Sequence, residues 1–199
     1  MVPREKYLSA GVHIGMTSKT AKMKKFIYKV RPSGLAVLNI SALDRRLDQA
    51  AGMLASYKNI LVVCYKDIGR EPAKKFAEAI GARSIIGRFM PGSLTNPTFK
   101  GFFEPDVIVV TDQASDTQAL KEATKIRVPI IALSDTFNDT AYIDLILPCN
   151  NKGKKSLALV YWILAKTIME KRGEKFTMKP EDFGYEPEKE MPAEVVEEA

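Results

Sequence analysis

The chain has 199 residues, of which 46% are hydrophobic, and it carries a net charge of +6. This length suits one well-buried domain with a tail, or at most two small domains. The longest apolar run, "LALVYWILA" at 157–165, is far shorter than the roughly 20 residues of a membrane-spanning helix, so we expect no membrane partner. With one histidine and two scattered cysteines, Cys64 and Cys149, we expect no metal site and reduced thiols in a cytoplasmic protein without a signal peptide.

The placement of the charges is more informative than their sum. Residues 1–34 carry eight basic side chains against Glu5 alone, a net charge of +7. Residues 174–199 carry nine acidic side chains against three lysines, a net charge of −6. A basic body with a short acidic tail is typical of a protein that binds a polyanion, although a merely soluble basic domain has the same composition.

Six short apolar runs predict β-strands. They are rich in Val, Ile and Leu and do not alternate with polar residues, which is the pattern of strands covered on both faces of a parallel sheet. In chain order they lie at 35–40, 59–65, 83–86, 107–111, 129–133 and 143–147.

Helical patterns lie between most of these runs. We expect Ser41 to cap a helix that extends to about Leu54, and Ser115 with Gln118 to form a capping box before another helix. A helix is also expected at 71–80, and a wide apolar stripe predicts one from about 157 to 168. Strands alternating with helices predict an α/β fold with three layers and a mostly parallel sheet.

Three parts of the chain follow from these patterns: a basic N-terminal segment at 1–34 that packs on the body, an α/β domain at 35–173, and an acidic extended tail at 174–199. Residues 16–25 offer only Met16, Ala21 and Met23 as apolar groups. Burial of so few groups does not offset the cost of ordering the chain. We therefore expect residues 16–25 to be mobile until a partner orders them.

Nucleotide-binding motifs are incomplete. "GKKS" at 153–156 resembles the end of a P-loop, but Pro148 stands where the first glycine belongs and a second lysine precedes Ser156. There is no G-x-G-x-x-G, and "HIGM" at 13–16 is only a fragment of a synthetase signature. We therefore expect no cofactor, and we expect His13 to be a packed or hydrogen-bonded side chain.

An enzyme remains one alternative. Ligands of open α/β sheets bind beyond the carboxyl ends of the strands, where the sequence places Arg88, Asp112 and Asp135. Arg88 could hold the phosphate of a small metabolite, and the two aspartates could hold Mg²⁺. The simpler interpretation is that Asp112, Asp135 and Asn150 stabilise turns, and no nucleophile–base pair is present to suggest catalysis.

Five stretches together identify a family resemblance. They are "YLSAGVHIG" (7–15), "FIYKVRPSGLAVLNI" (26–40), "IIGRFMPGSLTNP" (85–97), "EPDVIVVTD" (104–112) and "LPCNNKGKKSLALVYWILAK" (147–166). These resemble the universal small-ribosomal-subunit protein two family, over about residues 5–173. The helical hairpin that bacterial members insert after the "LTN" segment has no room here, and eukaryotic members have longer C-terminal extensions, so an archaeal source is expected.

The resemblance implies a flavodoxin-like fold, no catalysis, and a structural role in the small ribosomal subunit, in contact with rRNA and with neighbouring ribosomal proteins. No small-molecule substrate is implied, and we expect a monomer off the ribosome. The loop "GRFMPGSLTNP" is then expected to meet an rRNA phosphate or a protein neighbour.

Three basic surfaces are the candidates for RNA contact, because lysine and arginine supply most of the affinity for a phosphate backbone. The first is the N-terminal segment, where a helix would place three of its lysines on one face; the second is the loop after the third predicted strand; the third precedes the last helix. Their members are Lys19, Lys22, Lys24, Lys25, Lys29 and Arg31; Arg88 and Lys100; and Lys152, Lys154 and Lys155. A docking protein that binds acidic partners rather than RNA is the other alternative.

Overall fold

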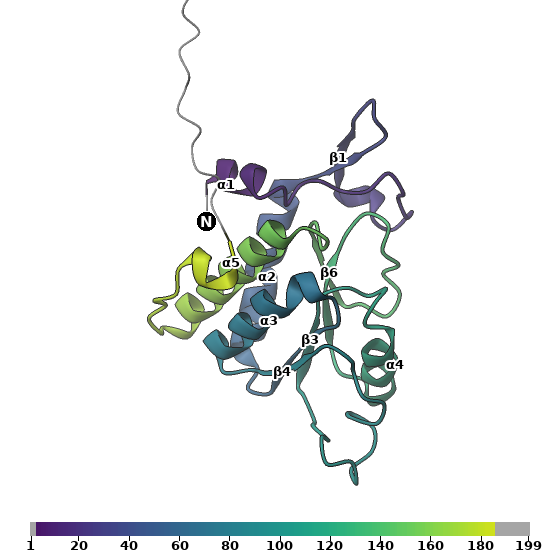
Figure 1. Cartoon of the computed structure of the whole chain (residues 1–199), viewed down its shortest axis with the longest axis vertical. Coiled ribbons are helices and arrows are strands. Elements are labelled where there is room, and N and C mark those ends of the chain that lie inside the picture. The colour runs from purple at the N-terminus through teal and green to yellow at the C-terminus, as the bar shows by residue number, and fades with distance from the viewer. Residues whose placement is uncertain (1–2, 186–199) are drawn as a thin grey trace, which may run out of the picture.

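The computed structural model describes residues 3–185 (Figure 1). Among these residues, the central sheet has five parallel strands in the order β4-β3-β5-β6-β7. Their bounds are β3 Ile60–Cys64, β4 Arg83–Ile86, β5 Val107–Val110, β6 Ile130–Ser134 and β7 Leu145–Pro148. This is the strand order of a flavodoxin-like fold, with the reversal of winding between β3 and β5. The predicted fold class is confirmed.

Both faces of the sheet are covered, which is why the three central strands β3, β5 and β6 are buried along their whole length. Ile60 and Val62 of β3 face one core with α2 (Ile40–Ser56), α3 (Asp67–Ile80) and α5 (Lys154–Arg172). Leu61 and Val63 face a second core with α4 (Thr117–Ile126). Figure 1 shows the three helices on one side of the sheet and α4 on the other. No helix joins β4 to β5, and Phe89 and Leu94 of that connection fill the second core instead.

Helix α5 is the most deeply buried helix, as its apolar sequence predicts. Its side chains from Ser156 to Tyr161 are buried in an unbroken run. The chain then turns back along α5, where Trp162 donates its indole N–H to the carbonyl of Met178 (3.0 Å). A short 3₁₀ turn, η2 (Pro180–Phe183), buries Phe183 completely. The first part of the acidic tail is therefore packed on the body. Within residues 3–185, no helix is long and apolar enough to cross a membrane.

Two predicted helix starts are wrong in detail. Asn39, not Ser41, caps α2, because the Asn39 side chain accepts from the backbone N–H groups of Ser41 and Ala42. Ser115 and Gln118 form no capping box: Ser115 donates to Asp112 and Gln118 donates to Glu122. Asn39 thus takes the role expected of Ser41, and carboxylates take the side chains of Ser115 and Gln118.

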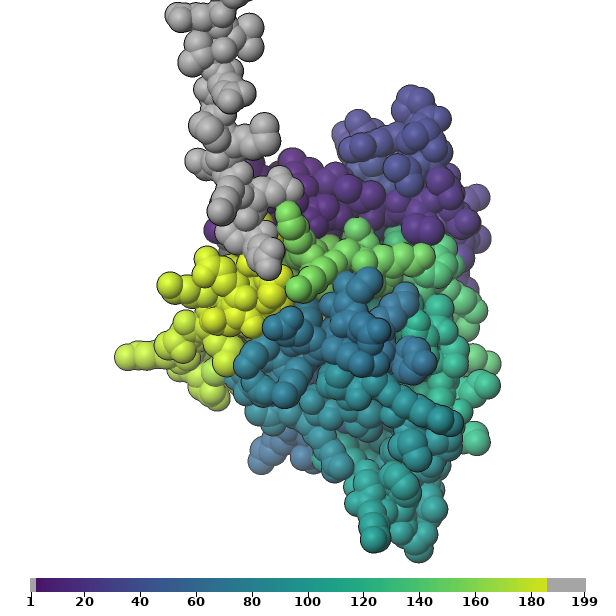
Figure 2. All heavy atoms as spheres, in the orientation of Figure 1, coloured from purple at the N-terminus to yellow at the C-terminus, as the bar shows by residue number. Residues whose placement is uncertain are grey.

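A hairpin stands apart from the central sheet. Strand β1 (Ile27–Val30) pairs antiparallel with β2 (Ala36–Leu38), so the run predicted at 35–40 does not join the parallel sheet. Gly34 has a φ of 82° and permits the turn between the two strands. Figure 2 shows this hairpin projecting from the end of the molecule that also carries the N-terminal residues.

Before the hairpin, the chain forms α1 (Arg4–Ser9) and then crosses the carboxyl edge of the sheet. The backbone carbonyl of Val12 accepts from Asn150 beyond β7 (3.0 Å). Beyond β6, the Thr136 hydroxyl accepts from the Met16 N–H (2.9 Å) and donates to the carbonyl of Ser18 (3.0 Å). Residue 15 must be glycine here, because a Cβ would lie 2.6 Å from a Thr136 methyl carbon.

Residues 16–25 bury more than the sequence predicts, because Met23 is not left in solvent. This side chain is fully buried in a small core with Phe26 and Leu38. Met23 precedes a single 3₁₀ turn, η1 (Lys24–Phe26), which leads into β1. One well-placed methionine and the hydrogen bonds to Thr136 therefore anchor the segment.

We expect the Met16 amide to be protected from hydrogen exchange in the free protein. Thr136→Val should speed its exchange by removing the hydroxyl that holds it, which costs about 1 kcal/mol or more. Mass spectrometry of exchanged peptides measures this. Thr167→Val is the matched control, because that hydroxyl bonds only the Ile163 carbonyl within α5. Equal exchange of the Met16 amide in all three proteins would contradict the docking.

Candidate nucleic-acid interface

The N-terminal cations lie on a turn and a strand rather than on a helix. Residues 24–26 form only η1, and β1 follows at once, so the expected helical face of Lys22, Lys25 and Lys29 does not exist. These three side chains are nevertheless exposed, as are Lys24 and Arg31, while Lys19 is half-buried. The exposed cations are available to a large anion, although their spacing follows the loop and strand geometry.

A basic recess beside η1 contains two arginines that sequence reasoning missed. Phe26 is nearly buried, with Lys25 Nζ 5.1 Å and the Arg46 guanidinium 5.6 Å from the centre of its ring. The recess has a volume of about 340 Å³ and also includes Arg45. Arginine forks match phosphate geometry better than lysine. The predicted helix after residue 40 already implied that Arg45 lies on its exposed face.

The third candidate surface lies at the start of α5. Lys152 is half-buried, with its Nζ 4.0 Å from the centre of the Phe137 ring and 3.7 Å from the Met16 sulfur. Lys154 is exposed, whereas Lys155 is half-buried and interacts with other groups of the chain. Through Met16, this surface adjoins the N-terminal segment.

Arg88 and Lys100 are not brought together. Arg88 is exposed directly after the carboxyl end of β4. Lys100 precedes Gly101, whose carbonyl accepts a hydrogen bond from Arg83 (3.5 Å) at the amino end of β4. A four-residue strand separates these two ends by ~10 Å. Figure 2 shows the connection between β4 and β5 forming the tip of the molecule opposite the hairpin.

The loop "GRFMPGSLTNP" does cradle an anion, but the anion belongs to the chain. The backbone N–H groups of Gly92 and Leu94 donate to the two carboxylate oxygens of Glu122 in α4 (2.8 and 3.1 Å). Thr95 and Gln118 donate to the same carboxylate. Burial alone would raise the pKa of Glu122, but these hydrogen bonds outweigh burial and lower the pKa below its ordinary value. The expectation that this loop's donors meet an RNA phosphate is therefore wrong for Gly92 and Leu94.

Glu122→Gln should destabilise the protein by about 2 kcal/mol at pH 7, because one amide N–H₂ would face a backbone donor in place of a charged acceptor. The lowered pKa of Glu122 stabilises the fold above the unfolded pKa, and this stabilisation is lost as the pH falls through the folded pKa. The difference in free energy of unfolding between wild type and variant, measured by urea unfolding, should therefore become smaller at acidic pH.

Glu78→Gln is the control, since Glu78 makes only a surface ion pair with Lys75 and should change stability by less than about 0.5 kcal/mol. Equal stability of the Glu122→Gln variant and wild type at pH 7 would refute the role of this carboxylate.

The carboxyl edge of the sheet, where an enzyme of this fold would bind its ligand, is occupied by a buried polar network. At the winding reversal, Lys66 Nζ lies 2.5 Å from Asp112 Oδ2. Asn138 donates to the other oxygen of Asp112 (2.8 Å), and Asn151 does so at 3.3 Å. Burial would raise the pKa of Asp112, but the Lys66 ammonium and these hydrogen bonds lower it. The Asp112 carboxylate is thus saturated by its own chain.

The neighbouring strand-end residues stabilise turns. The Asp135 carboxylate accepts from the N–H of Thr136 (2.6 Å). The Asn150 side chain accepts from the N–H groups of Lys152 and Gly153. Turn stabilisation by Asp112, Asp135 and Asn150 is therefore confirmed. Within residues 3–185, no three side chains of the metal-ligating kinds are grouped as a metal site.

Asp116 is a buried carboxyl beside this network whose pKa is raised toward neutrality. It is buried, its Oδ2 accepts from the Asp112 N–H, and its Oδ1 has no partner. Burial raises the pKa of Asp116 to about 7, and the Asp112 charge adds to the rise. Stability from this group is present below the unfolded pKa of ~4 and is lost as the pH rises to about 7.

Asp116→Asn should therefore remove a decline in stability between about pH 4 and 7, because the amide stays neutral. Urea unfolding at successive pH values measures the slope. Asp67→Asn, which changes an exposed carboxylate paired with Arg70, should keep the wild-type slope. An unaltered slope in Asp116→Asn would show that Asp116 does not titrate in this range.

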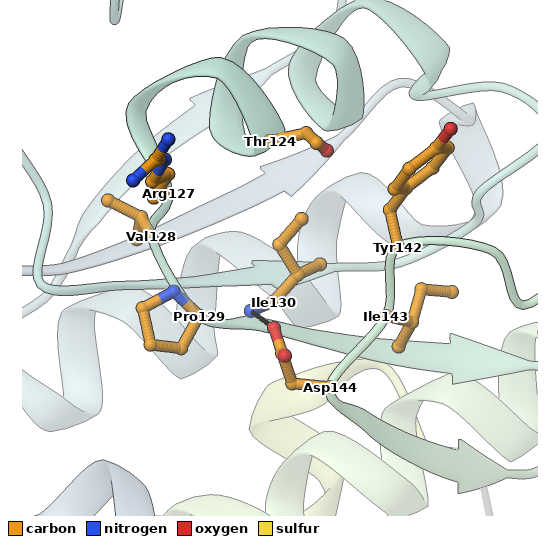
Figure 3. Close-up of a pocket in the computed structure, with 8 residues that line it drawn as sticks. All are labelled: Thr124, Arg127, Val128, Pro129, Ile130, Tyr142, Ile143 and Asp144. Atoms are coloured by element: carbon orange, nitrogen blue, oxygen red, sulfur yellow. Dashed lines mark hydrogen bonds between the residues drawn. The ribbon is translucent and has the colours of Figure 1, made fainter.

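A shallow recess at the amino edge of β6 carries two non-glycine residues with left-handed backbones, Arg127 (φ 59°) and Tyr142 (φ 63°). Figure 3 shows them on opposite sides of the recess, with the Asp144 carboxylate accepting from the Ile130 N–H (2.8 Å) between them. Arg127 ends α4. The recess is the seam between α4 and the connection from β6 to β7.

Comparison with known proteins places the chain in a family. Residues 7–101 and 100–171 match the family model described as Ribosomal protein S2. The chain belongs to the ribosomal protein S2 family. Over 175 residues it is 51% identical to the "Small ribosomal subunit protein uS2" of the archaeon Haloquadratum walsbyi, an alignment that covers 87% of this chain and 63% of that protein. The chain thus spans under two thirds of that relative's length.

The family identified from sequence is therefore confirmed. The matched regions contain all five stretches that carried the resemblance. They also contain every candidate RNA-contacting residue from Lys19 to Lys155. Membership of a ribosomal protein family agrees with the saturated carboxyl edge of the sheet, where an enzyme of this fold would keep its ligand site.

Proposed function

We propose that this chain is a structural constituent of the small ribosomal subunit that binds small-subunit rRNA and supports subunit assembly and translation. Membership of the ribosomal protein S2 family carries the proposal. Exposed cations on a docked N-terminal segment support it, because a fixed set of charges loses little freedom when RNA binds. The archaeal relative supports an archaeal source, and the ribosome places the protein in the cytoplasm.

The three parts of the chain have distinct roles in this proposal. Residues 1–34 and the hairpin present cations to RNA, residues 35–173 form the rigid support, and the exposed acids of the described part of the tail, Glu174, Glu181 and Asp182, face solvent or a basic ribosomal protein. Most acids of this tail lie at 186–199, outside the described residues. The free protein is proposed to be a monomer without a small-molecule substrate.

Binding would depend mainly on phosphate contacts and on the release of counterions from the RNA. Lys22, Lys25 and Lys29 supply exposed charge before, within and after η1, and Arg45 and Arg46 supply two guanidinium forks beside Lys25. Such contacts fix position on folded RNA and respond to shape more than to sequence.

The two alternatives are less well supported. An enzyme acting on a phosphorylated metabolite needs a free Asp112, but Lys66 and Asn138 occupy that carboxylate. An adaptor for acidic proteins would use the same cations, and an experiment has to distinguish it from a ribosomal protein. Sedimentation of a cell extract at low and high salt should place the chain with the small subunit; migration with free proteins only would contradict the proposal.

The triple variant Lys22→Ala, Lys25→Ala, Lys29→Ala should bind small-subunit rRNA more weakly. The slope of log K against log salt should shrink by about 0.7–0.9 for each lysine that contacts a phosphate. Filter binding at several salt concentrations measures this slope.

A charge-matched control replaces Lys58, Lys74 and Lys121, which are exposed outside the proposed surfaces. It loses the same charge but should keep the wild-type slope. If both triple variants behave alike, the N-terminal lysines act only through net charge, and this surface is not the interface.

A further inference from the structure

A groove of about 530 Å³ lies between α1, the hairpin and the start of α2. It is separate from the recess that contains Arg45 and Arg46. Three short segments within the first 41 residues form it, so no single sequence motif marks it. Its chemically active members are Arg4, His13, Tyr28, Lys29, Arg31 and the first residues of α2.

One wall of the groove is an aromatic ring that faces solvent. Tyr28 is 71% exposed, and Leu8 beside the groove is 50% exposed. Exposure of a tyrosine to this extent gives the fold none of the burial that usually justifies an aromatic side chain. A flat exposed ring beside cations is the arrangement on which unpaired bases stack.

The rim of the groove is basic. Arg4, Lys29 and Arg31 are exposed, and the residues that line the groove include no carboxylate. Arg4 is held in place by a hydrogen bond from its guanidinium to the Ser41 hydroxyl (3.0 Å). The 17-residue helix α2 begins in the groove and adds its positive end. The groove therefore favours an anion.

The floor of the groove includes the ring of His13. This side chain is 9% exposed, and its Nδ1 is buried without a partner within the described residues. Burial lowers the pKa of His13. The floor is therefore a largely enclosed ring, and the positive charge of the groove comes from its rim.

We propose that this groove binds one unpaired nucleotide of RNA, with the base stacked on Tyr28 and the phosphate beside Arg4 and Arg31. The proposal rests on the proposed function and deepens it, because it states what kind of RNA is bound and where.

Paired RNA does not fit this chemistry. A base within a duplex has both faces stacked and its pairing edge occupied, so it cannot stack on Tyr28. The groove is therefore specific for a bulge, loop or single strand, while the lysines around η1 accept phosphates of either form. The two surfaces should therefore differ in their affinity for single-stranded and for duplex RNA.

The test compares Tyr28→Ala with Tyr142→Ala in the full chain. Tyr142 is 75% exposed and lines other recesses, so its removal is a matched control. The probes are fluorescently labelled oligo(rA), oligo(rU) and oligo(dA) of eight nucleotides each, and an RNA duplex of eight base pairs. Tyr28→Ala should weaken binding of oligo(rA) about ten- to a hundred-fold and leave duplex binding unchanged, and Tyr142→Ala should change neither.

Wild-type affinity for oligo(rA) in Tyr28→Ala would overturn the groove as a nucleotide site. The proposed function would still stand if the lysine triple variant lost its salt slope on small-subunit rRNA. If wild type bound neither the oligonucleotides nor rRNA but bound an acidic peptide through Tyr28, both proposals would fail and the groove would be a protein-docking surface.

Discussion

The docking of the N-terminal segment across the carboxyl edge of the sheet determines most of what surrounds it. A parallel sheet leaves polar strand ends at this edge, and open α/β proteins commonly use the resulting crevice for ligands. Here Val12 bonds Asn150, and Thr136 holds Met16 and Ser18. These contacts position the hairpin, the lysines around η1 and the groove at Tyr28, because these features are built from the residues that come next along the chain.

Most of the central fold was predictable because its signals are local. The strands β3, β5 and β6 are mostly apolar runs, and α5 shows a helical stripe wide enough to imply burial on several sides. The hairpin could not be assigned in this way. Its strands are short, and β1 exposes three of four residues, so neither continuity nor alternation marks it. The burial of Met23 is likewise a tertiary fact, since its partner Leu38 lies fifteen positions away.

The candidate interface was predictable in composition but not in arrangement. The charge distribution marks the N-terminal lysines. No local pattern predicts that Lys25 and Arg46 lie beside the same Phe26 ring, or that Arg88 and Lys100 lie apart. The glycine-rich loop illustrates the limit most clearly. Its backbone donors do hold an anion, as the pattern indicates, but Glu122 lies about thirty residues away and only the fold brings it there. The groove at His13 had no sequence signal beyond the presence of a lone histidine.

The connection between β4 and β5 and the hairpin lie at opposite tips of the molecule (Figure 2). Between them stands a sheet packed on both faces, and packed interiors are nearly incompressible. If the proposed RNA contacts are made at both tips, the body holds the two RNA segments at one fixed separation and acts as a spacer of set length. An RNA whose two segments are misplaced would then meet one tip or the other but not both, and only the correctly folded RNA would gain the sum of the two contacts.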